Sequence, residues 1–404
     1  MAAKKKPWRR FRHRVFRLLG IIVLYPLCRW KYGLRLERCP DEKRRPSLIL
    51  YNHQTPFDQF FVGLSFRDPV YYVATEDIFS LGWISKLLRY AVAPIPILKQ
   101  TTDVSAILNC FRIAREGGSI AIAPEGNRTY SGKTEYMRSS IAALAKKLKL
   151  PIILYRIEGG YGVEPRWSDK RRKGHVHAYL YRIMEPEEYA DWSADELFIE
   201  IQNGLTVNEG KADGQYLSNR RAEYLERAVY VCPFCGLSEF ESSGNFVSCR
   251  RCGKRIEYGT DKTLNGVGFA FPFRFMTEWY DYQADYIRNL DVSVLTDEPV
   301  YTDQVTLKEV IVYRNKRLLR KSTELRLYGN RVSFDEGMPD EMVLSFDDIT
   351  AASVLGRNKM NLYTNETVFQ VKGEKRFNAL KYVHFYYRYR QIIRGEENGE
   401  FLGL

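Results

Sequence analysis

Short apolar runs alternate with amphipathic segments through the first half of the chain. The apolar runs predict buried strands at residues 48–51, 70–74, 119–123, 151–157 and 175–182. Helical spacing of apolar positions predicts helices at residues 56–66, 77–90, 103–116, 138–149 and 194–225. Residues 92–98 are strand-like, but Pro94 and Pro96 exclude a regular central strand. Alternating strands and helices predict an α/β fold, with a mixed, largely parallel sheet flanked by helices.

The second half of the chain has a different pattern. Residues 229–258 are expected to form a small separate unit, and the aromatic-rich residues 269–290 a helix. Residues 304–371 alternate between apolar and polar positions with turn signals between the runs, and a final helix is expected at 377–393. This order predicts a small antiparallel β-barrel-like domain with a C-terminal helix.

These patterns divide the 404 residues into five segments. Residues 1–32 are a basic, amphipathic segment, 33–228 the α/β domain, 229–258 the small unit, 259–300 an aromatic helical linker and 301–404 the β-rich domain. A hydrophobic content of 45% is enough for real cores and argues against disorder.

Positive charge concentrates at the N-terminus and points to anionic partners. The formal net charge is +13, and the first seventeen residues carry eight Lys or Arg and no acid. The apolar stretch 15–28 that follows is too short to span a bilayer, which takes about 20 apolar residues, and is followed by Trp30 and Lys31 rather than a signal-peptide cleavage site. We interpret it as an interfacial or partly inserted helix at the cytoplasmic face of a membrane. An ordinary core helix with a solvated basic tail is the alternative.

The segment from Asn52 to Asp58 carries the most informative chemistry. It follows a predicted buried strand, and Thr55 and Pro56 are suited to the N-cap and first position of a helix. His53 would then lie in the strand-to-helix turn and Asp58 in the first helical turn, where the two can converge as a general base and its orienting carboxylate. No nucleophilic serine lies nearby, so the substrate is expected to supply the attacking hydroxyl. A capping Asp beside a hydrogen-bonded core His is the structural alternative.

A second loop, residues 123–129, follows the apolar strand at 119–123. Gly126 permits a tight turn, Arg128 offers a planar donor fork suited to phosphate, and Thr129 adds a hydroxyl. Glu125 is expected to hold Arg128 in place or to bind an acceptor hydroxyl. A surface turn with a Glu–Arg ion pair is the alternative. Ligands bind beyond the carboxyl ends of parallel strands, so both loops are expected at one site.

Taken together, these residues resemble the glycerolipid acyltransferases, the 1-acylglycerol-3-phosphate (lysophosphatidic acid) acyltransferase family. Asn52, His53 and Asp58 match its first motif, Asn-His-x4-Asp, and residues 124–129 match its third, Pro-Glu-Gly-Thr-Arg-Ser, with Asn127 and Thr129 as substitutions. Its fourth motif resembles residues 150–153, which include Pro151. Its second is weaker at 94–99, where Lys99 replaces Arg and no Asp precedes it. The resemblance covers roughly residues 10–210.

The resemblance implies acyl transfer from acyl-CoA or acyl carrier protein to the hydroxyl of a lysophospholipid, with His53 and Asp58 as the catalytic pair. It also implies substrate binding by a set of eight residues: Asn52, Lys99, Glu125, Gly126, Asn127, Arg128, Thr129 and Pro151. Two alternatives stay open. One is another acceptor, such as glycerol-3-phosphate, another lysophospholipid or a glycolipid, and the other is a non-catalytic membrane scaffold with this fold.

Four of the seven cysteines form two C-x2-C pairs in residues 229–258. Cys232, Cys235, Cys249 and Cys252 have spacing typical of a tetrahedral zinc site. The segment resembles a zinc ribbon, and a closed four-thiolate site has no open position for catalysis. We expect structural Zn²⁺ here, with redox dithiols or another metal as alternatives. The ribbon's role is expected to be a hinge or protein contact rather than nucleic-acid binding.

Residues 304–393 weakly resemble a pleckstrin-homology-like domain of about seven strands and one closing helix. Lys316, Arg317, Arg320 and Lys321 could face anionic lipid or form a solvated hairpin. The expected partners of the whole chain are thus membrane lipids, a lysophospholipid and an acyl donor, and no nucleic acid.

Overall fold

The computed structural model describes residues 7–40, 45–75, 78–79, 82–97, 104–311 and 316–395. The chain forms two compact units. The first comprises Met1–Val163 and Lys173–Glu209, and the second comprises Glu164–Arg172 and Gly210–Leu404. The nine residues 164–172 therefore interrupt the first unit in sequence but belong to the second.

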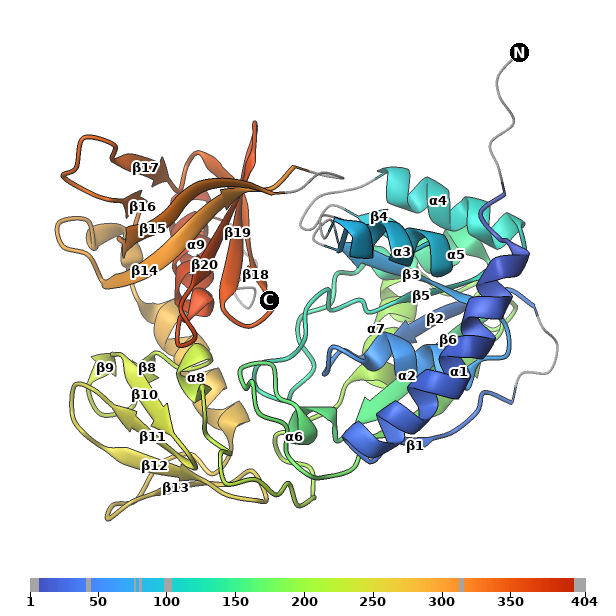
Figure 1. Cartoon of the computed structure of the whole chain (residues 1–404), viewed down its shortest axis with the longest axis horizontal. Helices are drawn as coiled ribbons and strands as arrows, with labels where there is room; N and C mark the ends of the chain where they lie inside the picture. Colours follow the sequence, from blue (N-terminus) through green and yellow to red (C-terminus); the bar gives the residue numbers. More distant parts are fainter. Residues whose placement is uncertain are drawn as a thin grey trace. The chain divides into compact units, whose positions relative to one another are not determined.

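The first unit is built around a seven-stranded mixed sheet of order β1-β7-β6-β2-β5-β3-β4 (Figure 1). Its strands are β1 (Arg35–Leu36), β2 (Leu48–Tyr51), β3 (Val70–Thr75), β4 (Ile95–Ile97), β5 (Ser119–Ile122), β6 (Ile152–Glu158) and β7 (His177–Met184). Only β6 and β7 pair antiparallel, and β2, the fully buried strand, runs parallel to both β5 and β6. The predicted mixed, largely parallel sheet is confirmed, and β4 with its Pro96 lies at the edge of the sheet, where a missing N–H is tolerated.

Helices cover both faces of this sheet. They are α1 (Phe11–Tyr32), α2 (Asp58–Ser65), α3 (Trp83–Ala91), α4 (Val104–Arg115), α5 (Ser140–Leu148), α6 (Gly160–Val163) and α7 (Ala194–Leu205). Apolar side chains of α4, α5 and α7 pack with Leu48, Leu50 and Ile152 of the strands in one core. Helices α1 and α2 pack together through Tyr32 and Phe61.

Three helix predictions in or beside this unit need correction. The helix predicted at 56–66 begins only at Asp58, because the Thr55 hydroxyl accepts the Phe57 N–H and holds residues 55–57 in a turn. The helix predicted at 194–225 ends at Leu205, since the segment after it pairs with residues 132–134 instead. For the one predicted at 77–90, the helix described begins at Trp83.

The second unit contains three groups of strands. A two-stranded sheet of β8 (Val231–Cys232) and β9 (Gly236–Leu237) precedes a four-stranded antiparallel sheet. The latter contains β10 (Phe240–Ser243), β11 (Phe246–Cys249), β12 (Arg255–Tyr258) and β13 (Leu264–Gly266). Helix α8 (Met276–Asn289) follows, so the helix predicted at 269–290 starts seven residues later, because Thr263 instead pairs with Phe275 in an isolated bridge.

A seven-stranded antiparallel sheet of order β17-β16-β15-β14-β20-β19-β18 completes the second unit (Figure 1). Its strands are β14 (Tyr301–Glu309), β15 (Arg317–Leu327), β16 (Arg331–Phe334), β17 (Met342–Ser345), β18 (Ile349–Leu355), β19 (Lys359–Thr364) and β20 (Val368–Gly373). Helix α9 (Ala379–Arg394) packs its aromatic side chains on this sheet, with the Tyr386 and Tyr387 hydroxyls donating to carbonyls of β18. Seven strands and one closing helix agree with the predicted β-rich domain. The division of the second unit into smaller domains stays a prediction.

Candidate active site

Two loops meet at the carboxyl edge of the first unit's sheet. Strands β2 and β5 are parallel neighbours, so the loops that follow Tyr51 and Ile122 leave the same edge. The His53 N–H donates to Oε1 of Glu125 at 2.7 Å, and the Thr129 N–H donates to the His53 carbonyl at 3.1 Å. The two motifs therefore lie side by side as expected, and one of the two hydrogen bonds between them joins backbone groups.

His53 and Asp58 form a close pair at this edge. Nδ1 of His53 lies 2.8 Å from Oδ2 of Asp58, and the His53 side chain is 22% exposed whereas Asp58 is fully buried. Because a carboxylate only accepts hydrogen bonds, the proton of this contact belongs to Nδ1, which leaves Nε2 as the proton acceptor. A base of this kind can take a proton from a hydroxyl group.

Further hydrogen bonds from the residues before the helix hold the Asp58 carboxylate in place. It also accepts the Gln54 N–H at 2.6 Å, the Thr55 N–H at 2.9 Å and the Thr55 hydroxyl at 2.6 Å. These charge-assisted bonds fix the carboxylate and, through it, the plane of the imidazole. Since the Thr55 hydroxyl donates to Asp58, it is not placed as a nucleophile, and the acceptor substrate remains the expected source of the attacking oxygen.

Glu125 has a different environment from the one expected. Its buried carboxylate accepts the N–H of His53 and, at 2.8 Å, the N–H of Glu135. Burial raises its pKa well above the ordinary value, while the two backbone N–H donors act in the opposite direction. These contacts assign Glu125 to joining the two loops. The expected pairing with Arg128 is not among the contacts that the structure gives this carboxylate.

The remaining residues of the second loop surround this contact. Gly126 has a positive φ of 66° and donates its N–H to Ala123, which is the tight turn expected of glycine. Asn127 and Thr129 are buried, Arg128 is half-buried, and the Thr129 hydroxyl accepts the Gly132 N–H at 2.9 Å. Their role in binding substrate stays a prediction.

Three predicted binding residues lie outside the second loop: Asn52, Pro151 and Lys99. The Asn52 amide bonds both to the carbonyl and to the N–H of Ile157, at 2.7 and 2.8 Å, and so joins β2 to β6. Pro151 precedes β6, whose Ile152 is in register with Leu48, so it lies at the opposite edge of the sheet from His53. The expectation that Pro151 contacts substrate is not supported by this register. Lys99 lies outside the described residues.

The structure adds two residues that the sequence did not single out. Oε1 of buried Gln54 accepts the Tyr161 N–H at 3.1 Å, and the buried Glu209 carboxylate accepts the Gly159 N–H at 2.6 Å. Gln54 stands inside the first motif and could have been noticed there. Glu209 lies fifty residues from its partner, and no sequence pattern marks that contact.

The four predicted cysteines come together in the second unit. The Sγ atoms of Cys232, Cys235, Cys249 and Cys252 all lie within 4.8 Å of one another. Cys232 and Cys252 are 3.8 Å apart, and Cys235 and Cys249 are 3.6 Å apart. Four thiolates at about 2.3 Å from a tetrahedral ion would be separated by about 3.8 Å, so this donor set fits a tetrahedral metal ion.

Comparison with known proteins finds one family model and several similar chains. The acyltransferase family model matches residues 35–157. A chloroplastic 1-acyl-sn-glycerol-3-phosphate acyltransferase of Brassica napus is 24% identical over 204 residues, which are 49% of this chain and 57% of that protein. A chloroplastic 1-acyl-sn-glycerol-3-phosphate acyltransferase of Arabidopsis thaliana is 24% identical over 168 residues, 40% of this chain and 46% of that protein. The chain thus spans about half the length of these two relatives.

Among solved structures, a 1-acyl-sn-glycerophosphate acyltransferase from Thermotoga maritima is similar at 17% sequence identity. The alignment covers 47% of this chain and 75% of that chain, with a TM-score of 0.39.

Proposed function

From the premise that residues 35–157 are an acyltransferase domain of the glycerolipid acyltransferase superfamily, we propose that this protein acylates the free hydroxyl of 1-acylglycerol-3-phosphate. The acyl donor is acyl-CoA or acyl carrier protein, and the product is phosphatidic acid. One observation carries the proposal: the His53–Asp58 pair, with its 2.8 Å contact, lies in a loop bonded directly to the Glu125–Thr129 loop. This arrangement combines a base with the loop expected to bind phosphate.

In the proposed reaction, the acceptor hydroxyl attacks the thioester carbonyl while Nε2 of His53 takes its proton. A carbon–oxygen bond forms, the carbon–sulfur bond breaks, and the imidazolium returns the proton to the leaving thiolate. Asp58 stabilises the imidazolium between these two events. Arg128 is the proposed phosphate contact, because its guanidinium can donate two parallel hydrogen bonds to a phosphate.

An acceptor comparison tests this proposal. The full chain is mixed with labelled acyl-CoA or acyl-acyl carrier protein and with 1-acylglycerol-3-phosphate in vesicles. We expect labelled phosphatidic acid, and far less product from monoacylglycerol, which has the hydroxyl but no phosphate. If acyl groups were transferred to glycerol-3-phosphate or another lysolipid instead, the proposed acceptor would be wrong. If no acceptor were acylated from either donor, a non-catalytic scaffold would be favoured.

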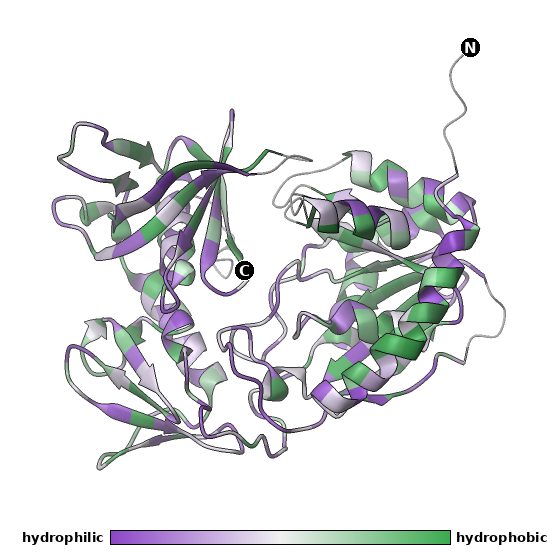
Figure 2. Ribbon diagram, viewed as in Figure 1, coloured by the Kyte–Doolittle hydropathy of each residue, from purple (hydrophilic) through white to green (hydrophobic). Residues whose placement is uncertain are grey.

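The protein is further proposed to bind the surface of an anionic membrane. No helix in the described ranges is long and apolar enough to cross a bilayer. Helix α1 nevertheless exposes large apolar side chains. Its hydrophobic residues are coloured green along the ribbon in Figure 2. The most exposed are Phe11 (78%), Leu18 (57%), Ile22 (70%), Val23 (64%) and Trp30 (80%).

Helix α3 extends this apolar surface. It lies beside α1, where the Arg12 side chain donates to the Tyr90 carbonyl at 2.9 Å and Phe16 packs edge-on against the Tyr90 ring. Trp83 is 72% exposed, and Ile84, Leu87 and Tyr90 are also exposed. Exposed cations such as Arg14 and Arg29 accompany these residues, which is the composition of an interfacial helix on anionic lipid.

Vesicle flotation measures this binding. We expect Ile22→Asp to weaken binding to anionic vesicles by roughly ten-fold or more, because inserting a fully buried side chain of this size is worth about 1.5–3 kcal/mol. Ile199 on α7 is 53% exposed but lies off this surface, so Ile199→Asp is the matched control and should bind as wild type. If both variants floated equally well, α1 would not be part of the surface that binds the membrane.

For the four-cysteine cluster, we propose structural Zn²⁺ as the bound ion. Four thiolates with this spacing suit zinc, and all four tetrahedral positions would be taken by protein. Such an ion would stabilise the fold of residues 229–258 and take no part in acyl transfer.

A further inference from the structure

Gln54 directly follows the proposed base in the chain, and its side-chain amide is only half used. The side chain is buried, and its Oε1 accepts the Tyr161 N–H at 3.1 Å. Because a backbone N–H can only donate, the oxygen of this amide must be the atom that faces Tyr161. Among the residues that the structure describes, Nε2 has no hydrogen-bond partner. Two N–H donors are therefore left without an acceptor one residue from His53.

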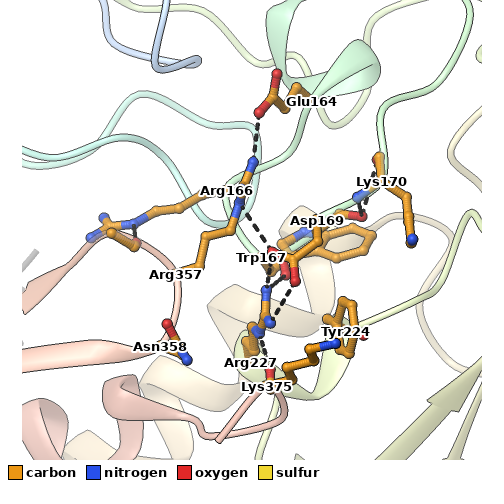
Figure 3. Close-up of polar contacts among 12 residues, drawn as sticks. Glu164, Arg166, Trp167, Asp169, Lys170, Tyr224, Arg227, Arg357, Asn358 and Lys375 are labelled. Carbon is orange, nitrogen blue, oxygen red and sulfur yellow. Dashed lines mark hydrogen bonds and ion pairs between the residues drawn. The ribbon is translucent and has the colours of Figure 1, made fainter. Parts of the chain in front are cut away.

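A buried side chain of the second unit shows the usual arrangement. Arg227 is 2% exposed and donates to the Asp169 carboxylate and to the carbonyls of Trp167 and Lys375 (Figure 3). Such pairing is the rule for buried polar groups, since one left without a partner costs roughly 1–3 kcal/mol. An unused buried donor therefore requires a physical explanation.

Asn52, two residues before Gln54, shows what a purely structural amide does in this loop. Its Nδ2 donates to the Ile157 carbonyl at 2.7 Å, and its Oδ1 accepts the Ile157 N–H at 2.8 Å. Both ends of that amide are used in joining β2 to β6. Gln54 joins its loop to α6 through the oxygen alone, so we expect the acceptor for Nε2 to come from a bound molecule.

Contacts within the first unit fix Gln54 relative to the proposed catalytic pair. Its backbone N–H donates to Oδ2 of Asp58 at 2.6 Å, and the same oxygen lies 2.8 Å from Nδ1 of His53. On the other side, a Cβ atom on Gly160 would lie 2.7 Å from Oε1 of Gln54, so the amide packs closely against the backbone of α6. The amide and the base are therefore held in one loop with a defined geometry.

The strand order separates Gln54 from the loop that is proposed to bind phosphate. Strand β2 lies between β6 and β5 in the sheet. The Glu125–Thr129 loop follows β5, whereas the Gln54 amide bonds to α6, which follows β6. The loop that carries His53 follows β2, between these two. A substrate complex that has its phosphate on the β5 side of the base can thus have another oxygen on the β6 side.

We propose that Gln54 is a further catalytic residue, whose Nε2 donates a hydrogen bond to the carbonyl oxygen of the thioester; this inference rests on the proposed function. When the acceptor oxygen bonds to the carbonyl carbon, the electron pair of the C=O double bond moves onto the carbonyl oxygen. The N–H bond of Gln54 stays intact and stabilises this negative charge. The charge disappears when the C=O double bond re-forms and the thiolate leaves.

The fixed position of the amide suits this role. A donor that is already oriented requires no reorganisation during the reaction, and its hydrogen bond to a charged oxygen is stronger in a buried site than in water. The carbonyl oxygen of the bound thioester is neutral and accepts more weakly than the oxyanion. The hydrogen bond therefore favours the transition state over the bound substrate and should act on kcat.

Gln54→Met removes the donor without adding charge, because methionine has a similar length and neither an N–H nor an O–H group. We expect kcat to fall by roughly 10²- to 10³-fold, the loss typical when one such donor is removed. KM for acyl-CoA should change far less, since the ground state gains little from this hydrogen bond. Initial rates over a range of acyl-CoA concentrations separate the two constants.

Gln54→Glu gives a readout that a structural role would not produce. Glutamate has the shape of glutamine and keeps an oxygen for the Tyr161 N–H. When ionised it has no donor, whereas its protonated form has an O–H group that can donate to the oxyanion. The rate of this variant relative to wild type should therefore rise as the pH falls through the pKa of the introduced carboxyl group. The relative rate of Gln54→Met should not change with pH.

Gln59→Glu is the matched control. Gln59 lies half-buried in α2, and its Nε2 already donates to the Pro56 carbonyl at 2.8 Å. Because this amide has its acceptor within the chain, we expect the rate of Gln59→Glu to follow that of wild type at each pH.

The outcomes separate this inference from the proposed reaction. If wild type transfers acyl groups and Gln54→Met keeps close to the wild-type kcat, Gln54 is not the oxyanion donor and the proposed function stands. Relative rates of Gln54→Glu that do not change with pH, with a lower melting temperature for both Gln54 variants, would assign the residue to folding alone. If wild type transfers no acyl group to any acceptor, the proposed function fails and this assignment of Gln54 fails with it.

Discussion

Replacing His53 with alanine is expected to lower the rate of acyl transfer by roughly 10²- to 10⁴-fold, the contribution typical of a positioned general base. The loss should fall on kcat, because the imidazole acts on the proton that moves in the transition state. His53 is only partly buried, and Asp58 keeps its other hydrogen bonds when the imidazole is removed, so the melting temperature should change little. Initial rates and thermal unfolding of the same preparation measure both effects.

Asp58→Asn is expected to give a similar kinetic loss but a different stability result. One oxygen of Asp58 accepts from His53, Gln54 and Thr55, and the other accepts the Thr55 hydroxyl. An amide NH₂ in the first position would face these N–H donors, and in the second it would require the Thr55 hydroxyl to turn from donor to acceptor. A buried group left without its partner costs roughly 1–3 kcal/mol. The two variants together therefore distinguish chemistry from folding.

His177 supplies the control for these variants. His177 is the first residue of β7, its side chain is 43% exposed and pairs with Glu37, and neither of the two motifs contains it. His177→Ala should retain wild-type transfer. If His53→Ala also retained it, the base would have to be assigned to another group, although the fold would be unaffected.

Loss of the proposed Zn²⁺ is expected to unfold the segment around β8 to β13. Structural zinc sites of this type contribute about 10–16 kcal/mol of apparent binding free energy near neutral pH. That is comparable with the whole stability of a typical domain, about 5–15 kcal/mol. The small sheets there have few alternatives for burying apolar area, so the ion would carry much of their stability.

Metal content and limited proteolysis test this expectation. We expect one zinc ion per chain, lost in Cys249→Ser, with new cleavage within residues 229–258 after chelation. Cys39 lies outside the cluster, so Cys39→Ser is the control and should keep the ion. A metal-free protein that resists protease as wild type does would show that the four cysteines are not a structural site.

Both predictions start from residues that the sequence alone identified. His53, Asp58 and residues 123–129 were placed near one another because their loops follow parallel strands, and ligands gather at that edge. The four cysteines were grouped by spacing alone. In each case a short pattern encodes the local geometry, and the contacts of 2.8 Å at the base and 3.6–3.8 Å between sulfurs agree with it.

The sequence does not reveal contacts with partners that lie far away in the chain. The Glu125 carboxylate accepts the backbone N–H groups of His53 and Glu135, which no motif indicates. The parallel register of β6 and β2 places Pro151 at the opposite end of the strands from His53, and its role in binding substrate stays a prediction. Residues 206–225 have helix-compatible composition, but pairing of 207–209 with residues 132–134 overrides that preference.

The sequence by itself determined the α/β class of the first half, its likeness to the acyltransferase family, the two neighbouring loops and the cysteine cluster. These depend on periodicity and on short motifs, which are local properties of the chain. Only the tertiary structure decided which groups donate hydrogen bonds to the carboxylates of Asp58 and Glu125. It alone showed that residues 164–172 belong to the second unit, with Trp167 and Ser168 fully buried. Burial and pairing between distant segments depend on the whole packed chain, and no local pattern of nine residues records them.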